Sequence, residues 1–244
     1  MMKKRKDPVF DLERAYADCH RIALSLANGE PCGRALDLGA GQGALSQALK
    51  ERGFEVTAAD VNAEQFRAVG VEFAKLDLNK PLPFPDQGFN LVLAAEILEH
   101  LEAPRAFVRE IFRILKPGGL AVVTTPNITS IPSRIFFLAT GFFDLFVPTK
   151  KRLKDPFSSE ADGHISPLPG WLLRYFLEDA GFEIEKTRYM MAYIPLVPPQ
   201  KSAREYSRSR AWRRRASGQC RPSSAQNVRP WPLTRVWTSS WRMT

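Results

Sequence analysis

Cysteine is scarce in this sequence, and long apolar runs are missing from it. The three cysteines, Cys19, Cys32 and Cys220, lie far apart and show no metal-ligand spacing. This pattern excludes a cysteine-based zinc site and a disulfide framework, so we predict no metal site and a reducing, cytoplasmic location. No apolar run approaches the ~20 residues of a membrane-spanning helix. The basic stretch from Met1 to Lys6 is not followed by an apolar segment, so we expect no secretory signal.

Acidic residues are almost absent from the C-terminal part of the chain. Residues 201–244 carry eleven lysines and arginines but one acid, whereas residues 1–200 carry 24 basic and 25 acidic side chains. The near-neutral body therefore lacks the electrostatic footprint of a nucleic-acid-binding domain. The stretch 201–244 fits either a basic and aromatic extension for RNA or a membrane, or translation of a GC-rich gene in the wrong reading frame. Both interpretations predict disorder there and one folded domain over residues 1–200.

One glycine-rich turn organises the chain. A short apolar strand ending at Leu38 leads into Gly39, Gly41 and Gly43, and an amphipathic helix pattern begins directly after them. A brief apolar run is typical of a strand buried on both faces, and glycine permits a tight turn and a close approach of the backbone to a ligand. Such a turn at the carboxyl end of a strand is where open α/β sheets bind nucleotides. A turn without a ligand is the alternative for a glycine triplet taken alone.

Two details of this turn indicate which ligand it binds. The spacing is G-x-G-x-G, and dinucleotide-binding folds use G-x-G-x-x-G. Asp37 stands two residues before the first glycine, where a carboxylate would repel a pyrophosphate and suit a positively charged ligand without phosphate. The stretch resembles the first motif of the class I S-adenosylmethionine-dependent methyltransferases. The resemblance implies a Rossmann-like, doubly wound, mostly parallel α/β fold that binds S-adenosylmethionine, with the methionine part of the cofactor at the glycine turn.

The second predicted strand, Glu55 to Ala59, ends in Asp60, which lies 17 residues beyond Gly43. An acidic residue at this place can accept both hydroxyl groups of a ribose, and the offset is close to that of nucleoside-binding folds. For Asp60 alone, an N-cap role for a helix starting near Asn62 is an equally good interpretation. In combination with the glycine turn, we favour the ribose role.

The resemblance assigns further residues to the cofactor. After the third predicted strand it implies that Asp77 accepts the adenine amino group and that Leu78 packs against the adenine ring. After the fourth strand, Leu91 to Ala95, it places Glu96 at the lip of the cofactor site. The string R-I-L-K-P-G-G, an apolar strand and then T-P-N at residues 125–127 continue the family pattern.

The pair Glu99–His100 and the T-P-N turn resemble the small-molecule O-methyltransferase branch, which includes enzymes of quinone biosynthesis. The resemblance covers residues 34–187. The family's fold closes with a seventh, antiparallel strand between the fifth and sixth, and we find no convincing candidate for it in the sequence.

Residues 128–169 interrupt the family pattern, and insertions at this place form the substrate lid in the family. Residues 131–147 are strongly apolar, and a basic run, Lys150 to Lys154, follows them. A lipophilic or anionic substrate, or shallow contact with a membrane surface, would suit this sequence. The alternative is an ordinary lid helix packed on its own domain.

Methyl transfer from a sulfonium is an in-line displacement, so most of the catalysis is positioning. A hydroxyl acceptor also benefits from a base, and a neutral histidine suits this role. The chain has three histidines: we interpret His20 as structural, favour His100 as the base, with Glu99 or Glu96 to orient it, and keep His164 as the second candidate. Catalysis by proximity alone is the remaining alternative.

Three functions are consistent with these observations. The first is methyl transfer to a small molecule, at a hydroxyl of a quinone precursor, lipid or saccharide. The second is a methyltransferase-like binding module without activity. The third is an RNA methyltransferase that uses the basic stretch 201–244. The sequence makes no prediction of the oligomeric state.

Overall fold

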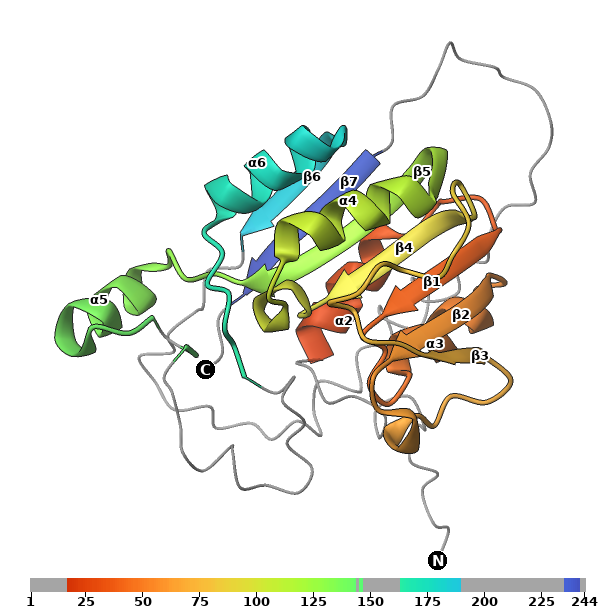
Figure 1. Cartoon of the computed structure of the whole chain (residues 1–244), viewed down its shortest axis with the longest axis horizontal. Helices are drawn as coiled ribbons and strands as arrows, with labels where there is room; N and C mark the ends of the chain where they lie inside the picture. The colour runs from red at the N-terminus through yellow and green to blue at the C-terminus, as the bar shows by residue number, and fades with distance from the viewer. Residues whose placement is uncertain (1–16, 144, 147–162, 190–234, 242–244) are drawn as a thin grey trace, which may run out of the picture.

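The apolar runs predicted as strands pair into one sheet in the computed structural model, which describes residues 17–143, 145–146, 163–189 and 235–241 (Figure 1). The strands are β1 (Arg34–Leu38), β2 (Glu55–Asp60), β3 (Glu72–Lys75), β4 (Phe89–Ala95), β5 (Leu115–Pro126), β6 (Glu183–Tyr189) and β7 (Arg235–Trp241). The helices are α2 (Ala17–Leu26), α3 (Ala44–Glu51), α4 (Pro104–Ile114), α5 (Ile131–Thr140) and α6 (Gly170–Ala180), with the short 3₁₀ helices η1 (Ala63–Gln65) and η2 (Leu98–His100).

The order of the strands is β3-β2-β1-β4-β5-β7-β6, and every neighbouring pair is parallel. The chain runs outward from β1 to β3 and then returns to place β4 beside β1. This reversal is the topological switch point, and ligands of doubly wound sheets bind outside the carboxyl ends of the strands there. The predicted Rossmann-like, doubly wound parallel fold is confirmed.

Helices cover both faces of the sheet, because the central strands are apolar on both faces. On one face α4 and α6 pack through residues that include Phe107, Ile111 and Leu177, and on the other α2 and α3 pack through Ala23 and Leu49 (Figure 1). The two layers bury β1 and β4 between them and so fix the position of their carboxyl ends.

The seventh strand corrects the sequence prediction. The sequence suggested no candidate for it and predicted disorder throughout 201–244, yet β7 lies between β5 and β6. It is parallel to both neighbours, where the family pattern has an antiparallel strand. A parallel strand needs a long crossover connection, and residues 190–234 separate β6 from β7. The prediction weighed composition and overlooked that Val, Trp and Thr in R-V-W-T-S-S-W favour a strand. The rest of 201–244 lies outside the described residues.

The predicted lid, residues 128–169, is described in part. Its apolar segment forms α5, which begins after Ser130, whose hydroxyl accepts a hydrogen bond from the backbone N–H of Ser133. The helix ends at Gly141, whose left-handed backbone stops it. Of the ten residues of α5, Ser133 alone is buried, so most of its apolar side chains are at least partly exposed. The basic run at 150–154 lies outside the described residues.

None of the helices in the part of the chain that the structure describes combines the length and the apolar character that a membrane crossing demands.

Candidate functional site

The glycine turn between β1 and α3 is built from left-handed backbone. Gly39, Gly41 and Gly43 have φ angles of 73°, 55° and 89°, in a region that favours glycine. A Cβ on Gly39 would lie 1.9 Å from Cδ1 of Ile97, whereas a Cβ on Gly41 would meet nothing within 4 Å. Gly39 therefore lets the turn pack against the segment after β4, and Gly41 keeps a stretch of backbone open to a ligand.

Asp60 holds this turn from the end of β2. Its Oδ2 accepts a 2.8 Å hydrogen bond from the backbone N–H of Gly41, and its Oδ1 accepts one of 2.8 Å from that of Asn62. The N-cap interpretation of Asp60 is wrong, because the side chain that caps η1 belongs to Asn62, which accepts from the N–H of Glu64. Oδ1 also accepts a 3.4 Å hydrogen bond from Nε2 of Gln65, whereas Oδ2 has a further acceptor position. The predicted hydrogen bonding to a ribose is therefore compatible with these contacts at Oδ2.

Asp37 lies beneath the turn in the interior of the protein. It is 1 % exposed, and its Oδ2 accepts a 2.5 Å hydrogen bond from Oγ of Ser46 in α3. Burial raises the pKa of Asp37 to about 6, and the hydrogen bond from Ser46 opposes this rise. The residue therefore joins β1 to α3 within the protein, and its predicted contact with the cofactor stays a prediction.

Asp77 and Leu78 follow β3 at the same edge of the sheet. The Asp77 side chain is exposed, and its Oδ1 accepts a hydrogen bond of 3.0 Å from the N–H of Asn79. Leu78 is partly buried against the apolar core. The backbone N–H of Leu76 donates to the carbonyl of Asp60 at 3.0 Å, which ties this segment to the end of β2. The predicted adenine-binding residues are thus next to the predicted ribose-binding residue.

Glu96 follows β4 in an unusual backbone conformation, with a φ angle of 54°. Oγ1 of Thr124 donates to its Oε1 at 2.7 Å, and the thiol of Cys19 lies 3.7 Å from the same oxygen. Burial raises the pKa of Glu96 to about 7. A positive φ in a residue other than glycine is a sign of a functional constraint, and here it places a half-buried carboxylate at the switch point.

A short strap, which we define as Gly163 to Ser166, is bound to η2. The carbonyl of Glu99 accepts hydrogen bonds from the N–H groups of Ile165 at 2.8 Å and Ser166 at 3.0 Å. The hydroxyl of Ser166 donates to the carbonyl of Leu101 at 2.5 Å. These contacts hold the strap, which is part of the predicted lid and precedes α6, against the turn that follows β4.

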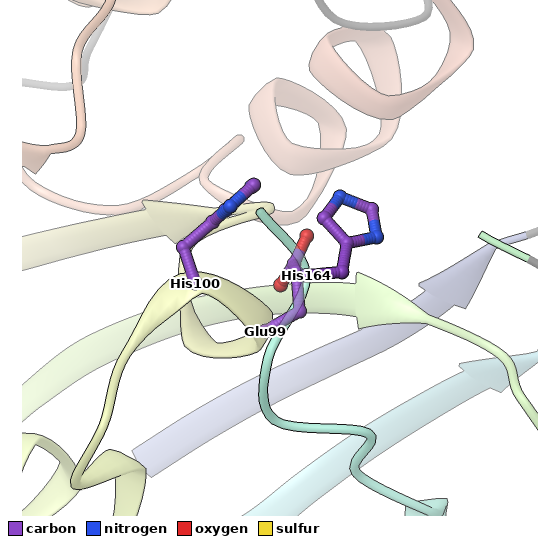
Figure 2. Close-up of side chains that lie close together, drawn as sticks. All are labelled: Glu99, His100 and His164. Carbon is purple, nitrogen blue, oxygen red and sulfur yellow. The ribbon is translucent and has the colours of Figure 1, made fainter. Parts of the chain in front are cut away.

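The strap brings His164 to His100. Their ring centroids are 4.7 Å apart with an interplanar angle of 78°, and Nδ1 of His100 lies 3.2 Å from the carbonyl oxygen of Gly163. Glu99 is fully buried, and its Oε2 accepts a 3.2 Å hydrogen bond from Oγ1 of Thr125. Figure 2 shows the Glu99 carboxylate between the two imidazole rings. Burial, and then the charge of Glu96, raise the pKa of Glu99 well above its usual range.

The sequence identified both histidines but not their proximity, since they lie 64 positions apart in the chain. It named Glu99 only as a residue that orients His100, and it missed Thr124 and Cys19 as the partners of Glu96. No local pattern signals these contacts, because each joins segments that are distant in the sequence.

The residues at this edge suit S-adenosylmethionine, which carries a sulfonium and an ammonium group and no phosphate. Asp60 at the turn, and Glu96 above its pKa of about 7, carry negative charge that complements a cationic ligand, whereas Asp37 lies buried beneath the turn. The open backbone at Gly41 leaves room for the ligand to approach. The same carboxylates would repel a pyrophosphate, because both groups are negatively charged.

Comparison with known families gives a match to the model of the methyltransferase domain family over residues 10–187. A probable S-adenosylmethionine-dependent methyltransferase of Mycolicibacterium smegmatis is 30% identical over 156 residues, which make up 62% of this chain and 52% of that protein. A ubiquinone biosynthesis O-methyltransferase of Psychrobacter arcticus is 33% identical over 105 residues, 38% of this chain and 41% of that protein. The chain thus spans about half the length of the curated relatives it matches.

Solved structures show the same fold. An S-adenosylmethionine-dependent methyltransferase from Archaeoglobus fulgidus has a TM-score of 0.52 at 24% identity and covers 68% of both chains. A methyltransferase-like protein from Bacillus halodurans has a TM-score of 0.51 at 22% identity over 68% of this chain and 70% of that one. With the family match and the geometry of the glycine turn, they lead to one conclusion: this chain belongs to the methyltransferase domain family, as a class I member whose cofactor is S-adenosylmethionine.

Proposed function

We propose that this chain transfers a methyl group from S-adenosylmethionine to a hydroxyl group of a small molecule, such as a quinone precursor, a lipid or a saccharide. The observation that carries this proposal is the pairing of His100 with His164, whose ring centroids are 4.7 Å apart. The pair lies close to the glycine turn, since His100 is three residues beyond Ile97, which packs on Gly39. A hydroxyl acceptor needs to lose a proton, and a histidine in this place can accept it.

The cofactor supplies an electrophilic methyl group on a positively charged sulfur, and the residues of the chain position the reactants. In the proposed arrangement the glycine turn and Asp60 hold the methionine and ribose parts. Asp77 and Leu78 bind the adenine. The half-buried carboxylate of Glu96 supplies negative charge beside the cationic part of the ligand when it is ionised, above its pKa of about 7.

His100 is the favoured base. The Gly163 carbonyl, 3.2 Å from Nδ1, favours the tautomer in which Nδ1 carries the hydrogen and Nε2 accepts a proton. His164 packs against the ring of His100 and is the second candidate. Catalysis by proximity alone is the alternative, and variants of the two histidines distinguish it from base catalysis.

The exposed apolar face of α5 supports a lipophilic acceptor. Leu138 is 86% exposed, and Ile131 and Ile135 are also exposed on the same helix. Isolated apolar side chains at a surface are normal, but several on one lid helix favour contact with an apolar ligand or a membrane surface. The basic run 150–154 adds preference for an anionic partner. The cytoplasmic location expected from the cysteine pattern is part of the same proposal.

The test is a methyl-transfer assay with the full chain, labelled S-adenosylmethionine and a panel of hydroxylated aromatics, lipids and saccharides, each with and without an apolar tail. We expect turnover on a tailed aromatic hydroxyl, and a loss of roughly 10²–10⁴-fold in kcat for the variant that lacks the base, His100→Gln or His164→Gln. Arg174→Ala, in an exposed ion pair with Glu178 on α6, is the matched control and should keep full activity.

Two outcomes would favour the other functions. Binding of S-adenosylhomocysteine without turnover on any acceptor would indicate an inactive binding module. Methylation of RNA, with an affinity that falls steeply as salt increases, would indicate an RNA methyltransferase. Full activity in both histidine variants would leave proximity as the source of catalysis.

A further inference from the structure

Glu99, His100 and His164 have the composition of a metal site. We propose that these three side chains bind a divalent transition-metal ion of the zinc class, for which cobalt can substitute. One oxygen of Glu99 and one ring nitrogen of each histidine all lie within 4.8 Å of one another (Figure 2). Ligands about 2.1 Å from a metal ion lie roughly 3.0–3.5 Å apart in tetrahedral geometry. The three atoms therefore reach an ion through small side-chain rotations, without movement of the backbone.

The buried carboxylate of Glu99 provides a second, independent indication. The side chain is fully buried, and its Oε1 accepts no hydrogen bond from any of the residues that the structure describes. A buried polar atom without a partner is costly to the fold. A cation held by the two neighbouring imidazoles would satisfy this oxygen, because it would lie next to the carboxylate that Figure 2 shows between the rings.

The kind of donor decides the kind of metal. Calcium and magnesium prefer sites made of oxygen atoms, whereas imidazole nitrogen suits zinc, copper, nickel and iron. Two imidazoles and one carboxylate give a site with two nitrogen donors and one oxygen donor. Three protein ligands also leave a coordination position for water or for a substrate, as in catalytic zinc sites.

The ion would connect two segments of the chain. Glu99 and His100 belong to η2, and His164 belongs to the strap. In the structure, hydrogen bonds from Ile165, Ser166 and the Ser166 hydroxyl already hold the strap on η2. A metal ion on His164 would add a bond across the same contact, so it would stabilise the position of the strap at the switch point.

For the chemistry, the metal and the histidine base are alternatives. An imidazole bound to an ion does not accept a proton, but an ion lowers the pKa of a hydroxyl group that ligates it. This consequence rests on the proposed methyl transfer to a hydroxyl. Metal binding itself does not rest on it, and the two can be tested separately.

The experiment uses the full chain without a histidine tag, so that the three histidines of the sequence are the only ones present. After removal of metal with a chelator, Co²⁺ is titrated and followed by its visible absorption, and Zn²⁺ and Mg²⁺ are titrated by calorimetry. We expect one Co²⁺ or Zn²⁺ per chain with micromolar or tighter affinity, and binding of Mg²⁺ at least tenfold weaker. Zn²⁺ should also slow hydrogen exchange at the amides of Ile165 and Ser166.

Two variants and a control make the assignment specific. Glu99→Gln and His164→Gln should each weaken Zn²⁺ binding roughly tenfold or more, and His20→Gln, which changes the histidine outside the cluster, should leave it unchanged. Binding of S-adenosylhomocysteine confirms that each variant is folded. If Glu99→Gln does not fold, Zn²⁺ binding by His164→Gln is the test of the site. Absence of Zn²⁺ binding in the wild type, or equal binding in the folded variants, would overturn the proposal. If the metal-free protein still transfers the methyl group, the metal site is unaffected by that result, and a histidine is the group that accepts the proton of the acceptor.

Discussion

At the scale of single residues, Asp60 serves both the fold and the candidate site. Its two oxygens accept hydrogen bonds from the backbone of Gly41 and of Asn62, so the carboxylate fixes the glycine turn before a ligand binds. Preorganisation of this kind reduces the cost of ordering the loop on binding. A substitution at Asp60 therefore removes both a proposed ligand contact and the support of the turn.

We predict that Asp60→Ala weakens binding of S-adenosylhomocysteine by roughly 1.5–3 kcal/mol, the value of hydrogen bonds to a charged group. Titration calorimetry measures this, with Asp86→Ala as the matched control, because Asp86 is an exposed aspartate in an ion pair with Arg113 away from the turn. Unchanged affinity in a folded Asp60→Ala variant would rule out the ribose role.

Asp37 makes the stability of the protein depend on pH. Burial raises its pKa from 3.8 to about 6, so the folded protein binds this proton more tightly than the unfolded chain does. The contribution of Asp37 to stability is therefore fully present below about pH 4 and is lost as the pH rises through about 6. A difference of about two pKa units corresponds to roughly 3 kcal/mol.

We therefore predict that, between about pH 4 and pH 7, the wild type loses on the order of 3 kcal/mol more unfolding free energy than Asp37→Asn does. Denaturant titrations of both proteins across this range give the comparison, and Asp86→Asn, an exposed position, should follow the wild type. Parallel stability curves for wild type and Asp37→Asn would contradict the prediction.

At the scale of elements, the turn from β1 to α3 and the segment after β4 fit together at one point, Gly39 against Ile97. We predict that Gly39→Ala lowers the free energy of unfolding by about 2–4 kcal/mol, because its Cβ would clash with Ile97 and its φ angle is positive. When Gly39→Ala is made in the Ile97→Ala variant, the clash should be absent, and the loss relative to Ile97→Ala alone should be the backbone cost of about 1–2 kcal/mol.

Gly41→Ala is the contrasting case, because its Cβ would meet nothing within 4 Å. Gly41→Ala should lower the free energy of unfolding by about 1–2 kcal/mol, the cost of backbone strain alone. We expect it to weaken the binding free energy of the cofactor by more than this loss of stability. Equal stability losses for Gly39→Ala and Gly41→Ala in denaturant titrations would show that Ile97 does not restrict this turn.

The elements that the sequence predicted well are those with local signals. Glycine spacing located the turn after β1, and apolar runs located β1, β2 and β4. The elements of the site that it missed depend on distant partners. His164 reaches His100 through the hydrogen bonds of the strap, and Glu96 is fixed by Thr124 on β5. These contacts exist only when the sheet has formed, so no window of sequence contains them.

At the scale of the whole molecule, β7 is the clearest example of a non-local contact. Its pairing with β5 and β6 joins residues far apart in the chain. The residues Val, Trp and Thr within it favour a strand, but no regular apolar period accompanies them. The prediction of disorder throughout residues 201–244 is therefore wrong for Arg235–Trp241, which form β7.

We predict that a chain ending at Gln200 is less stable than the full chain, because β5 and β6 both lose the strand that pairs with them. A loss of about 2–3 kcal/mol would lower Tm by about 5–10 °C for a protein of this size. Differential scanning calorimetry of the two chains measures the shift, and a matched internal change, Arg174→Ala, should leave Tm within about 1–2 °C. An equal Tm for both chains would show that β7 does not stabilise the sheet.

The order of β5, β7 and β6 also determines when the sheet can be completed during synthesis. A ribosome makes β5 and β6 before residues 235–241, so the strand that belongs between them is the last to be made. Until it is made, two strand edges remain without hydrogen-bonding partners, and such edges pair readily with other chains. Slow translation, or a stop codon between β6 and β7, would therefore promote aggregation of chains that lack β7.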